Sequence, residues 1–578
     1  MKPCTLDFDF LRSQVVGADA TVSTPFGDRL MVYADYTASG RCLDLIERYI
    51  QNLQRIYANT HTEDDISGRS MSQLLEQAES SIKRSVNAGR DGRIVCIGTG
   101  ATGAIDKLQQ IIGIALPPAT RSNLTRMMQE ALGAEAHAQF TGYLRQRQPV
   151  VFVGPYEHHS NEISWRANLA TVVEVRLSAD GGIDLDHLEA LLQDPAYRDR
   201  VRIGSFSAAS NVTGRLTPTH RIAALLHRHG ALACFDYAAS APYVKIDMNP
   251  PADQHDGDAS LDAVFLSPHK FLGGPGASGV LVFNKRLYHP ELPPTVSAGG
   301  TVDYVGPDSA DFIVDIEERE KAGTPGVLQI LKAGLAFQLK DRIGVEAIER
   351  RERELLNKTF ERWRGNPNIE ILGNPDPQQR IAIVSFNLKA PRGRYLHPKF
   401  VTSLLNDLFG IQSRAGCSCA GPYGHRLLNI DHDTSERYRA WIHKGFCGIK
   451  PGWCRISLHY VMDDLEADYI LDAIDFVAEQ GYRFLPLYNF DVHTGAWQHK
   501  FDEVALEGFS LETALECPGY HSRGLTDSER ELLYRSFLLE AGRLAGQLAR
   551  EQPPEEHRLD EALEELKFFS VPEASMLR

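Results

Sequence analysis

This sequence has few cysteines, no long apolar run and no excess of basic residues, and each deficit excludes a class of protein. The nine cysteines are too few and too scattered for a disulfide framework in 578 residues, so we expect a protein of the reducing cytoplasm. No apolar run approaches the roughly 18 residues of a membrane-spanning helix, and the N-terminus lacks the apolar core of a secretion signal. The formal charge of −15, from 61 basic and 76 acidic residues, argues against a general nucleic-acid binder. The spacing of Cys447 and Cys454 matches a zinc ligand pair poorly, so no metal site is expected.

What the sequence does contain is an alternation of apolar strands and helical stretches from about residue 93 to 285. This alternation predicts a parallel or mixed α/β sheet covered by helices on both faces. A helical stretch after about residue 330 leads to a smaller α+β domain, with strands near 381–388 and 453–459 and a helix over 464–479. The predicted organisation is an N-terminal segment (1–30), a large domain (31–330), a small domain (331–482) and a helical C-terminal extension (483–578).

The C-terminal extension carries two helix signals. Thr526 stands three residues before Glu529, which is the spacing of a capping box at the start of a helix. Beyond Pro553, the pattern predicts a second helix over 557–568.

One lysine, Lys270, lies between a polar turn and a run of glycines in the segment LSPHKFLGGPGASGVLVF. The apolar residues before it predict a buried strand that ends at this turn, and the glycines allow a backbone to approach a flat ligand closely. A lysine whose pKa is lowered by desolvation or by a neighbouring cation becomes nucleophilic toward aldehydes. The segment favours a Schiff-base lysine; an exposed loop lysine beside glycines is the alternative.

A second apolar strand ends at Asp236, in ALACFDYAASAPY. Because an unpaired buried carboxylate is very costly, this acid requires a cationic partner. A protonated pyridine nitrogen is one such partner. Pyridoxal phosphate needs both an imine-forming lysine and an acid that keeps its ring nitrogen protonated, so Lys270 and Asp236 together point to this cofactor.

Three further strand ends carry polar residues suited to the same cofactor. In IVCIGTGATGAIDKL, a strand that ends near Ile97 meets a turn that opens a helix at about Ile105, which predicts a phosphate cradle with contacts from Ala101 and Thr102. An ordinary strand-to-helix turn is the alternative. His158, after the strand in VVFVGPYEHHSNEISW, could stack on the ring or move protons, or be a structural histidine. Asn211, in SNVTG, could donate to the ring oxygen or be part of a turn.

Together these segments resemble the class V aminotransferase superfamily of fold type I pyridoxal phosphate enzymes, and within it the cysteine desulfurase and selenocysteine lyase branch. The resemblance runs from about Tyr33 to about Tyr482 and rests on YADYTASG, GATGAID, EHHSN, SNVTG, DYAASA, SPHK, AGTP and SRAGCSCAGP in this order. It implies an α/β fold whose large domain has a mostly parallel seven-stranded sheet between helices, with a smaller α+β domain.

The resemblance also implies the role of each site residue. Lys270 would hold the cofactor and act in catalysis, Asp236 would pair with the pyridine nitrogen, His158 would stack on the ring, and Asn211 would bond its oxygen. The phosphate would be contacted by Ala101, Thr102, Ser267 and His269. Thr324 would reach the phosphate of a partner subunit, which implies a homodimer with shared sites.

The loop from Ser413 to His425 would select the reaction. In desulfurases, a cysteine at the position of Cys419 takes sulfur from the substrate as a persulfide, and alanine is released. Arg414 could lower the pKa of that thiol or bind the substrate carboxylate. Cys417 stands where the family usually has a histidine; a similar arrangement occurs in molybdenum cofactor sulfurases. The pair Cys417 and Cys419 could resolve a persulfide, form a redox couple or be inert.

Two more residues are expected to bind substrate, and one departs from the family pattern. Arg455 is implied to grip the α-carboxylate of an amino acid, with a surface ion pair as the alternative, and His61 resembles the histidine of an N-terminal substrate loop. Ala239 replaces a glutamine that usually touches the ring oxygen, and Val461 a common asparagine.

We therefore expect an enzyme of the cysteine desulfurase type that acts on an amino acid such as L-cysteine, passes sulfur to an acceptor protein, and binds neither nucleic acid nor membrane. A class V aminotransferase, an epimerase or another C–S β-lyase is the alternative, and Ala239 supports it. The extension at 483–578 could cover the active site, bind a partner protein or enlarge a dimer interface.

Overall fold

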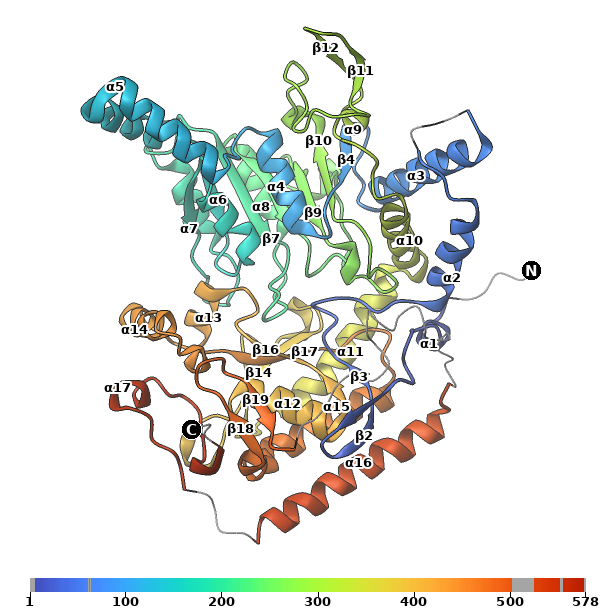
Figure 1. The fold of residues 1–578 in the computed structure, drawn as a ribbon, viewed down its shortest axis with the longest axis vertical. Coiled ribbons are helices and arrows are strands. Elements are labelled where there is room, and N and C mark those ends of the chain that lie inside the picture. Colours follow the sequence, from blue (N-terminus) through green and yellow to red (C-terminus); the bar gives the residue numbers. More distant parts are fainter. Residues whose placement is uncertain (1–5, 61, 63, 502–523, 551–554, 576–578) are drawn as a thin grey trace. The chain divides into compact units, whose positions relative to one another are not determined.

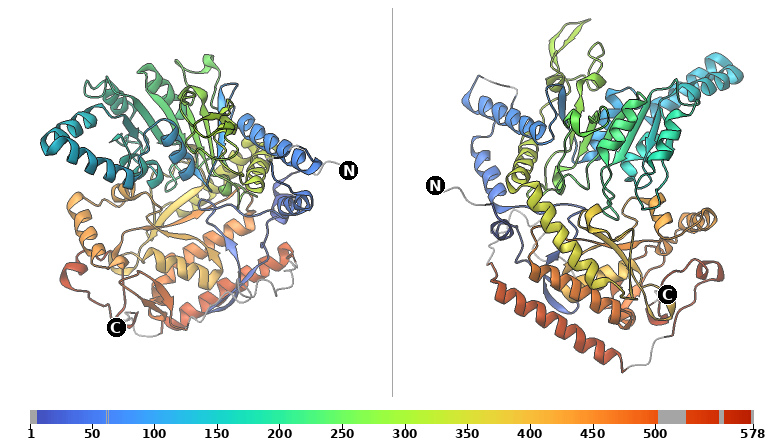
Figure 2. Two further views of the ribbon diagram at one scale, coloured as in Figure 1. Left: turned by 45° about the horizontal axis from the view of Figure 1, so that its top comes forward. Right: turned by 180° about the vertical axis from the view of Figure 1, so that it is seen from behind.

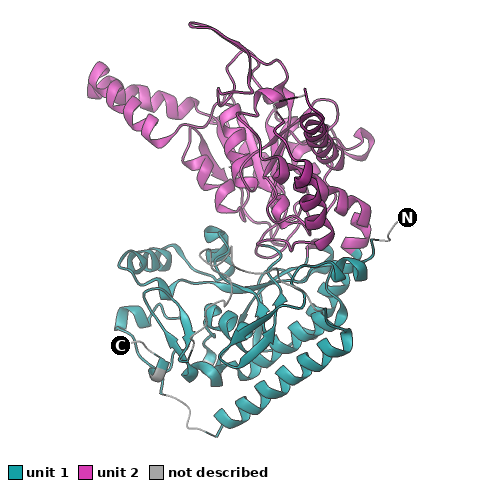
Figure 3. Ribbon diagram, turned by 45° about the vertical axis from the view of Figure 1, so that its right-hand side comes forward, with its two compact units in different colours: residues 1–37, 350–378, 382–578 teal, residues 38–349, 379–381 magenta. Residues whose placement is uncertain are grey.

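The computed structural model describes residues 6–60, 62, 64–501, 524–550 and 555–575, which fold into two compact units. Unit 1 comprises residues 1–37, 350–378 and 382–578, and unit 2 comprises residues 38–349 and 379–381 (Figure 3). Within the described residues, no helix combines the length and the apolar character that crossing a membrane requires.

Unit 2 is built on a seven-stranded sheet with the order β4-β10-β9-β8-β7-β5-β6 (Figure 1). Neighbouring strands from β9 to β6 are parallel, and β10 is antiparallel to both of its neighbours. The strands are β4 (Gly92–Cys96), β5 (Val150–Val153), β6 (Thr171–Glu174), β7 (Arg202–Ser207), β8 (Leu232–Asp236), β9 (Ala263–Leu266) and β10 (Val280–Asn284). The predicted α/β fold is thereby confirmed.

The strands of this sheet are short and apolar because both faces are covered. Every residue of β5 and of β9 is buried, as expected for parallel strands between helical layers. The helix α4 (Ala101–Ile111) contacts β9 and β10, and its Ile105 and Leu108 join Val151 and Phe265 in one apolar core. The other long helices of unit 2 are α2 (Asp44–Leu53), α3 (Ile66–Ser85), α7 (Leu185–Gln193), α8 (Thr219–Arg228) and α10 (Val327–Ile343).

One helical segment of unit 2 lies outside this core and was not foreseen. The segment α5 (Pro118–Arg147) is interrupted at Gly133, where φ is 77°, and none of its 30 residues is buried. Figure 2 shows it projecting from the rest of unit 2 as two helical arms. Its exposed side chains include Leu124, Met127 and Tyr143. Because the segment has no buried face, the sequence offers little of the periodic signal that identifies a core helix.

Unit 1 contains a four-stranded sheet with the order β13-β14-β17-β16, in which every pair is antiparallel. Its strands are β13 (Ile369–Ile371), β14 (Ile383–Leu388), β16 (Arg414–Gly416) and β17 (Trp453–Ser457), and its helices include α12 (Pro398–Phe409) and α15 (Asp464–Gln480). The strands expected near 381–388 and 453–459 and the helix expected over 464–479 are confirmed. The helical stretch expected after 330 is instead two helices, α10 and α11 (Val345–Trp363), because Gly344 has a φ of 87° between them.

The first helix of the C-terminal extension forms as predicted, and the second does not. In α16 (Asp527–Leu548), Thr526 and Glu529 form the capping box, and Tyr534 stacks on Tyr469 of α15 with ring centroids 3.9 Å apart. The helix predicted over 557–568 is reduced to α17 (Glu561–Glu564). The chain leaves helical geometry beyond it because Phe568 and Phe569 pack around the buried His397, whose ring centroid lies 4.6 Å from that of Phe569.

Candidate active site

The predicted cofactor residues of unit 2 follow the carboxyl ends of five strands that run in one direction. Because such ends meet at one edge of a sheet, these residues gather there. We call them the strand-end cluster: Ala101 and Thr102 after β4, His158 after β5, Asn211 after β7, Asp236 at the end of β8, and Ser267, His269 and Lys270 after β9.

A small cradle forms where α4 begins. The backbone N–H of Ala101 donates to Ser267 Oγ at 2.9 Å, and His269 Nδ1 lies 2.6 Å from the Thr99 carbonyl oxygen. A Cβ at Gly100 would lie 3.0 Å from His269 Cε1 and 3.1 Å from Ser267 Oγ, so glycine keeps this space open. The helix begins at Ala101 and not near Ile105 as predicted, so Ala101 and Thr102 are its first two residues. First-turn N–H groups are those that a helix N-terminus offers to an anion, and in this structure Ser267 Oγ accepts from that of Ala101.

Asp236 is the buried acid of the cluster, with 4% of its surface exposed. Burial raises the pKa of its carboxyl group, while a hydrogen bond from the Ala238 backbone N–H at 2.8 Å and the charge of Lys270 lower it. A cation bound next to Asp236 would therefore be stabilised by a carboxylate that water solvates poorly.

Lys270 ends a short turn, Pro268–Lys270, and its backbone N–H donates to the Ser267 carbonyl at 3.0 Å. Gly274, after the turn, is needed for the packing of the turn itself. A Cβ at this position would lie 1.9 Å from the Pro268 carbonyl oxygen. The same lysine charge that acts on Asp236 also lowers the pKa of His269, where burial is the larger cause. The amine of Lys270 is thus electrostatically coupled to both residues.

His158 and Asn211 lie on turns that hydrogen bonds hold closed. The Ser160 backbone N–H donates to His158 Nδ1 at 3.2 Å, and Ser160 Oγ lies 2.7 Å from the same atom. Nδ1 is therefore the acceptor, and the proton of the neutral ring is on Nε2. The turn at Asn211 is held by Ser210, whose Oγ accepts from the backbone N–H groups of Val212 and Thr213 at 3.2 Å each.

Glu157 was quoted in the motif EHHSN but given no role by sequence reasoning. It is 4% exposed, and its carboxyl oxygens accept four hydrogen bonds. The signal that could have identified it is its position, four residues after a wholly buried strand and directly before His158.

One other predicted residue of unit 2, Thr324, takes no part in these contacts. Thr324 is exposed, and its Oγ1 accepts a hydrogen bond from Asn59 Nδ2 at 3.0 Å. His61 lies outside the described residues.

In unit 1, the two predicted substrate arginines share one carboxylate that the sequence reasoning missed. Arg455 on β17 is 3% exposed, and its Nη2 lies 2.7 Å from Asp35 Oδ1. Arg414 on β16 is directly opposite Arg455 in the sheet register, and its Nη1 lies 3.9 Å from Asp35 Oδ2. Arg455 does form an ion pair, but its side chain is buried and that of its partner Asp35 is 15% exposed. The two guanidinium groups exceed the carboxylate by one positive charge, which suits an anionic ligand.

Cys417 and Cys419 of unit 1 lie on a tight turn between β16 and α13 (Gly421–Leu427). We call residues 417–420 the cysteine loop; the Ala420 N–H closes it by donating to the Cys417 carbonyl at 3.0 Å. Cys417 is exposed and Cys419 partly buried, and both thiols are free. Ser418 and Cys419 have φ values of 50° and 56°, a left-handed conformation that costs a non-glycine residue roughly 1–2 kcal/mol. Such strain is typical of functional turns.

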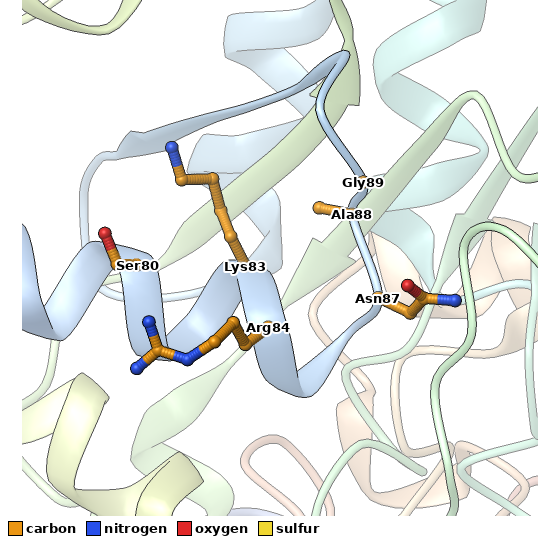
Figure 4. A pocket seen from close by; sticks show the side chains of 6 residues that line it. All are labelled: Ser80, Lys83, Arg84, Asn87, Ala88 and Gly89. Carbon is orange, nitrogen blue, oxygen red and sulfur yellow. The ribbon is translucent and has the colours of Figure 1, made fainter.

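Two surface pockets of unit 2 contain none of the predicted residues. One, of about 430 Å³, is lined by Ser80, Lys83, Arg84, Asn87, Ala88 and Gly89 at the end of α3 (Figure 4). Lys83 is already paired with Glu317 at 2.7 Å. The other, of about 510 Å³, includes His227, Asp258 and Arg286.

The strand-end cluster has the donor set that pyridoxal phosphate requires. It combines backbone N–H groups at a helix N-terminus with an open glycine cradle, a buried acid for the ring nitrogen and a lysine coupled to that acid. The residues present therefore fit this cofactor.

Comparisons with known proteins agree with this chemistry. The family model described as Aminotransferase class-V matches residues 131–470. A probable cysteine desulfurase of Halalkalibacterium halodurans is 28% identical over 397 residues, which cover 68% of this chain and 84% of that protein. Another from Staphylococcus aureus is 27% identical over 412 residues, 70% of this chain and 86% of that protein.

Solved structures show a similar fold. The cysteine desulfurase of Thermococcus onnurineus NA1 superposes with a TM-score of 0.61 at 18% identity, over 82% of this chain and 98% of that one. The cysteine desulfurase CsdA of Escherichia coli gives a TM-score of 0.61 at 19% identity, over 82% and 99% of the two chains.

Proposed function

The chain belongs to the aminotransferase class-V family, whose members are enzymes that depend on pyridoxal phosphate, and from this premise we propose that it is a cysteine desulfurase-like enzyme. It would bind pyridoxal phosphate in the strand-end cluster, take the sulfur of L-cysteine as a persulfide on Cys419, and release alanine. The observation that carries the proposal is the meeting of a buried acid, a coupled lysine and a helix N-terminus at one edge of the sheet.

When bound, pyridoxal phosphate supplies an electron sink for the bonds of an amino acid. Lys270 Nζ would hold its aldehyde and move a proton at the substrate Cα. Asp236 would keep the ring nitrogen protonated, and His158 would stack on the ring. The phosphate would be bound by Ala101, Thr102, Ser267 and His269, and the ring oxygen by Asn211.

The cysteine loop supplies the group that receives sulfur. Cys419 would act as a thiolate, since the thiolate and not the thiol is the nucleophile. The names of the relatives, both probable cysteine desulfurases, support this assignment over an inert loop. The persulfide sulfur would then pass to an acceptor protein.

The substrate carboxylate would be bound by the arginines of unit 1. The carboxylate of Asp35 pairs with Nη2 of Arg455 and would fix the plane of its guanidinium group. Arg414, whose side chain is 45% exposed, supplies the second positive charge. Planar guanidinium groups bind carboxylates through paired hydrogen bonds. His61 would contribute to the same substrate, and Thr324 would contact the phosphate of a second subunit in a homodimer.

The experiment that tests the proposal measures sulfide and alanine release from L-cysteine by the purified protein with pyridoxal phosphate and a reductant. Wild type is compared with Cys419→Ser and, as the matched control two residues away, Cys417→Ser. We expect release to fall by at least about 100-fold in Cys419→Ser only, because it removes the nucleophile. Equal release by all three proteins would contradict the role of Cys419.

A second candidate function is favoured by one observation. Ala239, which is 7% exposed, cannot supply the amide that desulfurases usually place against the ring oxygen. A protein that shows a visible absorbance band with the cofactor but releases no alanine from cysteine would be a class V aminotransferase, an epimerase or another C–S β-lyase. Transamination and β-elimination assays with other amino acids would distinguish these activities.

A further inference from the structure

Glu157 is one of several buried acidic residues of unit 2, and the proposed mechanism does not use it. Its Oε1 accepts from the backbone N–H groups of Gly154 at 3.1 Å and Ser207 at 2.8 Å. Its Oε2 accepts from Ser207 Oγ at 2.6 Å and Asn161 Nδ2 at 2.7 Å. The four donors come from the end of β5, the turn after it and the end of β7, so one carboxyl group ties these three segments together.

The surroundings are fitted to this carboxyl group. A Cβ at Gly154 would lie 2.5 Å from Glu157 Oε1, so only glycine leaves room for it there. Asn161, which is fully buried, is held in turn by Ser205 Oγ at 2.6 Å and Trp165 Nε1 at 3.2 Å, both of which donate to its Oδ1. The orientation of the Asn161 amide is therefore fixed, and its N–H group must point at Glu157.

Glu157 is linked to two predicted cofactor residues, His158 through the chain and Asp236 through Ser207. It precedes His158 in the chain, on the turn that the hydrogen bonds to β7 hold in place. Its partner Ser207 is paired in register with Asp236 of β8, and the Ala208 backbone N–H donates to the Asp236 carbonyl at 2.8 Å. Burial raises the pKa of Glu157 to about 7, with the charge of Asp236 adding to the rise and the Ser207 and Asn161 hydrogen bonds opposing it.

We propose that Glu157 is a positioning residue of the cofactor site, which fixes the turn of His158 against β7 and, when its carboxyl group is ionised, adds a second negative charge near Asp236. The inference rests on the proposed cofactor site and deepens it. A pyridine nitrogen paired with Asp236 would be stabilised in its protonated form by both carboxyl groups, since unit charges interact strongly where water is excluded. Lys270 is the cation whose charge acts on Asp236 from the β9 side.

The test uses bound pyridoxal phosphate without substrate, in wild type and in Glu157→Gln. In the variant the amide N–H would face the N–H of Asn161, and no negative charge could form. We expect about 10-fold weaker cofactor binding in a titration of the apoprotein, because the turn of His158 loses its anchor. We also expect the pH midpoint of the cofactor's visible absorbance change to fall by roughly 0.5 unit, because the protonated form loses a nearby anion.

Glu162→Gln is the matched control. Glu162 is 5% exposed and lies on the same stretch of chain, but it pairs with Arg166. Its variant should keep the wild-type midpoint and affinity. An unchanged midpoint and an affinity within twofold of wild type in a folded Glu157→Gln protein would overturn the proposal.

If Glu157→Gln does not fold, Ser207→Ala decides the question. It removes one donor from the carboxylate and should shift the midpoint in the same direction by a smaller amount, and no shift would overturn the proposal. Absence of any visible band in wild type would instead refute the cofactor site itself, so the two failures are distinguishable.

Discussion

The strand-end cluster of unit 2 and the cysteine loop of unit 1 differ in how their geometry is fixed. In the cluster, Asp236 is buried, and local hydrogen bonds close the turns that follow β5, β7 and β8. In the loop, Cys417 is exposed, and Ser418 and Cys419 adopt left-handed conformations in a turn that the hydrogen bond from the Ala420 N–H to the Cys417 carbonyl closes. A site that binds a cofactor permanently gains from rigid supports, whereas a group that must take up sulfur and pass it on needs access. Changes in the two regions should therefore have different consequences.

The largest effect is expected from Lys270→Ala, which removes the proton carrier and the cofactor-holding amine together. Turnover of L-cysteine should fall by at least about 1,000-fold, and the visible band of the bound cofactor should shift. Lys285→Ala, at a surface lysine that pairs with Asp91 at 2.8 Å, is the control and should retain activity. Normal turnover by Lys270→Ala would refute the assignment of the strand-end cluster as the pyridoxal phosphate site.

The next largest effect is expected from Asp236→Asn. The change leaves a bound pyridinium without its buried counter-charge, so cofactor affinity should fall by about 100-fold. Fluorescence titration of the apoprotein with pyridoxal phosphate measures this loss. If the variant matched wild type in kinetics and in cofactor affinity, Asp236 would not be the counter-charge of a bound pyridinium.

A smaller effect is expected from the buried ion pair of unit 1. Arg455→Lys keeps the charge but loses the planar fork, so the KM for L-cysteine should rise by about 10-fold with little change in kcat. Asp35→Asn should act in the same way, since Asp35 fixes the guanidinium group at 2.7 Å. A fall in kcat at constant KM would show that Arg455 acts on the chemical step instead.

The smallest effect on activity is expected from α16. Tyr534 is 4% exposed and stacks on Tyr469, so Tyr534→Ala should lower the free energy of unfolding by about 3 kcal/mol while kcat/KM per folded molecule stays close to wild type. Leu532→Ala, at a side chain that is 70% exposed, should change stability by less than about 0.5 kcal/mol. A loss of activity without loss of stability in Tyr534→Ala would give the extension a role in the reaction.

The sequence predicts the strand ends well because their signals are local. A run of buried apolar residues followed by Asp236 or by the turn of Lys270 marks where each strand ends. Asp35 was missed because its partners Arg414 and Arg455 are hundreds of residues away, and only the folded sheet brings them together. Glu157 was missed for a similar reason, since one of its hydrogen-bond partners, Ser207, is on another strand, 50 residues away in the chain.

The errors in secondary structure have physical causes. The helix at Ala101 begins earlier than predicted. The first-turn residues Ala101 and Ala104 are buried in the core, but their small side chains give a weak apolar signal in the sequence. The helix predicted over 557–568 is shortened because two phenylalanines gain more from packing around His397 than from a helical backbone.

The projecting segment α5 has a practical consequence for work on this protein. It lies between α4 and β5 in the chain, and none of its residues is buried. Sequence at its tip, around Gly133, can therefore be exchanged or lengthened without disturbing the sheet, as at other exposed insertion points. The tip is a natural place to attach a fluorophore, an affinity tag or a surface tether, leaving the strand ends and both chain termini untouched.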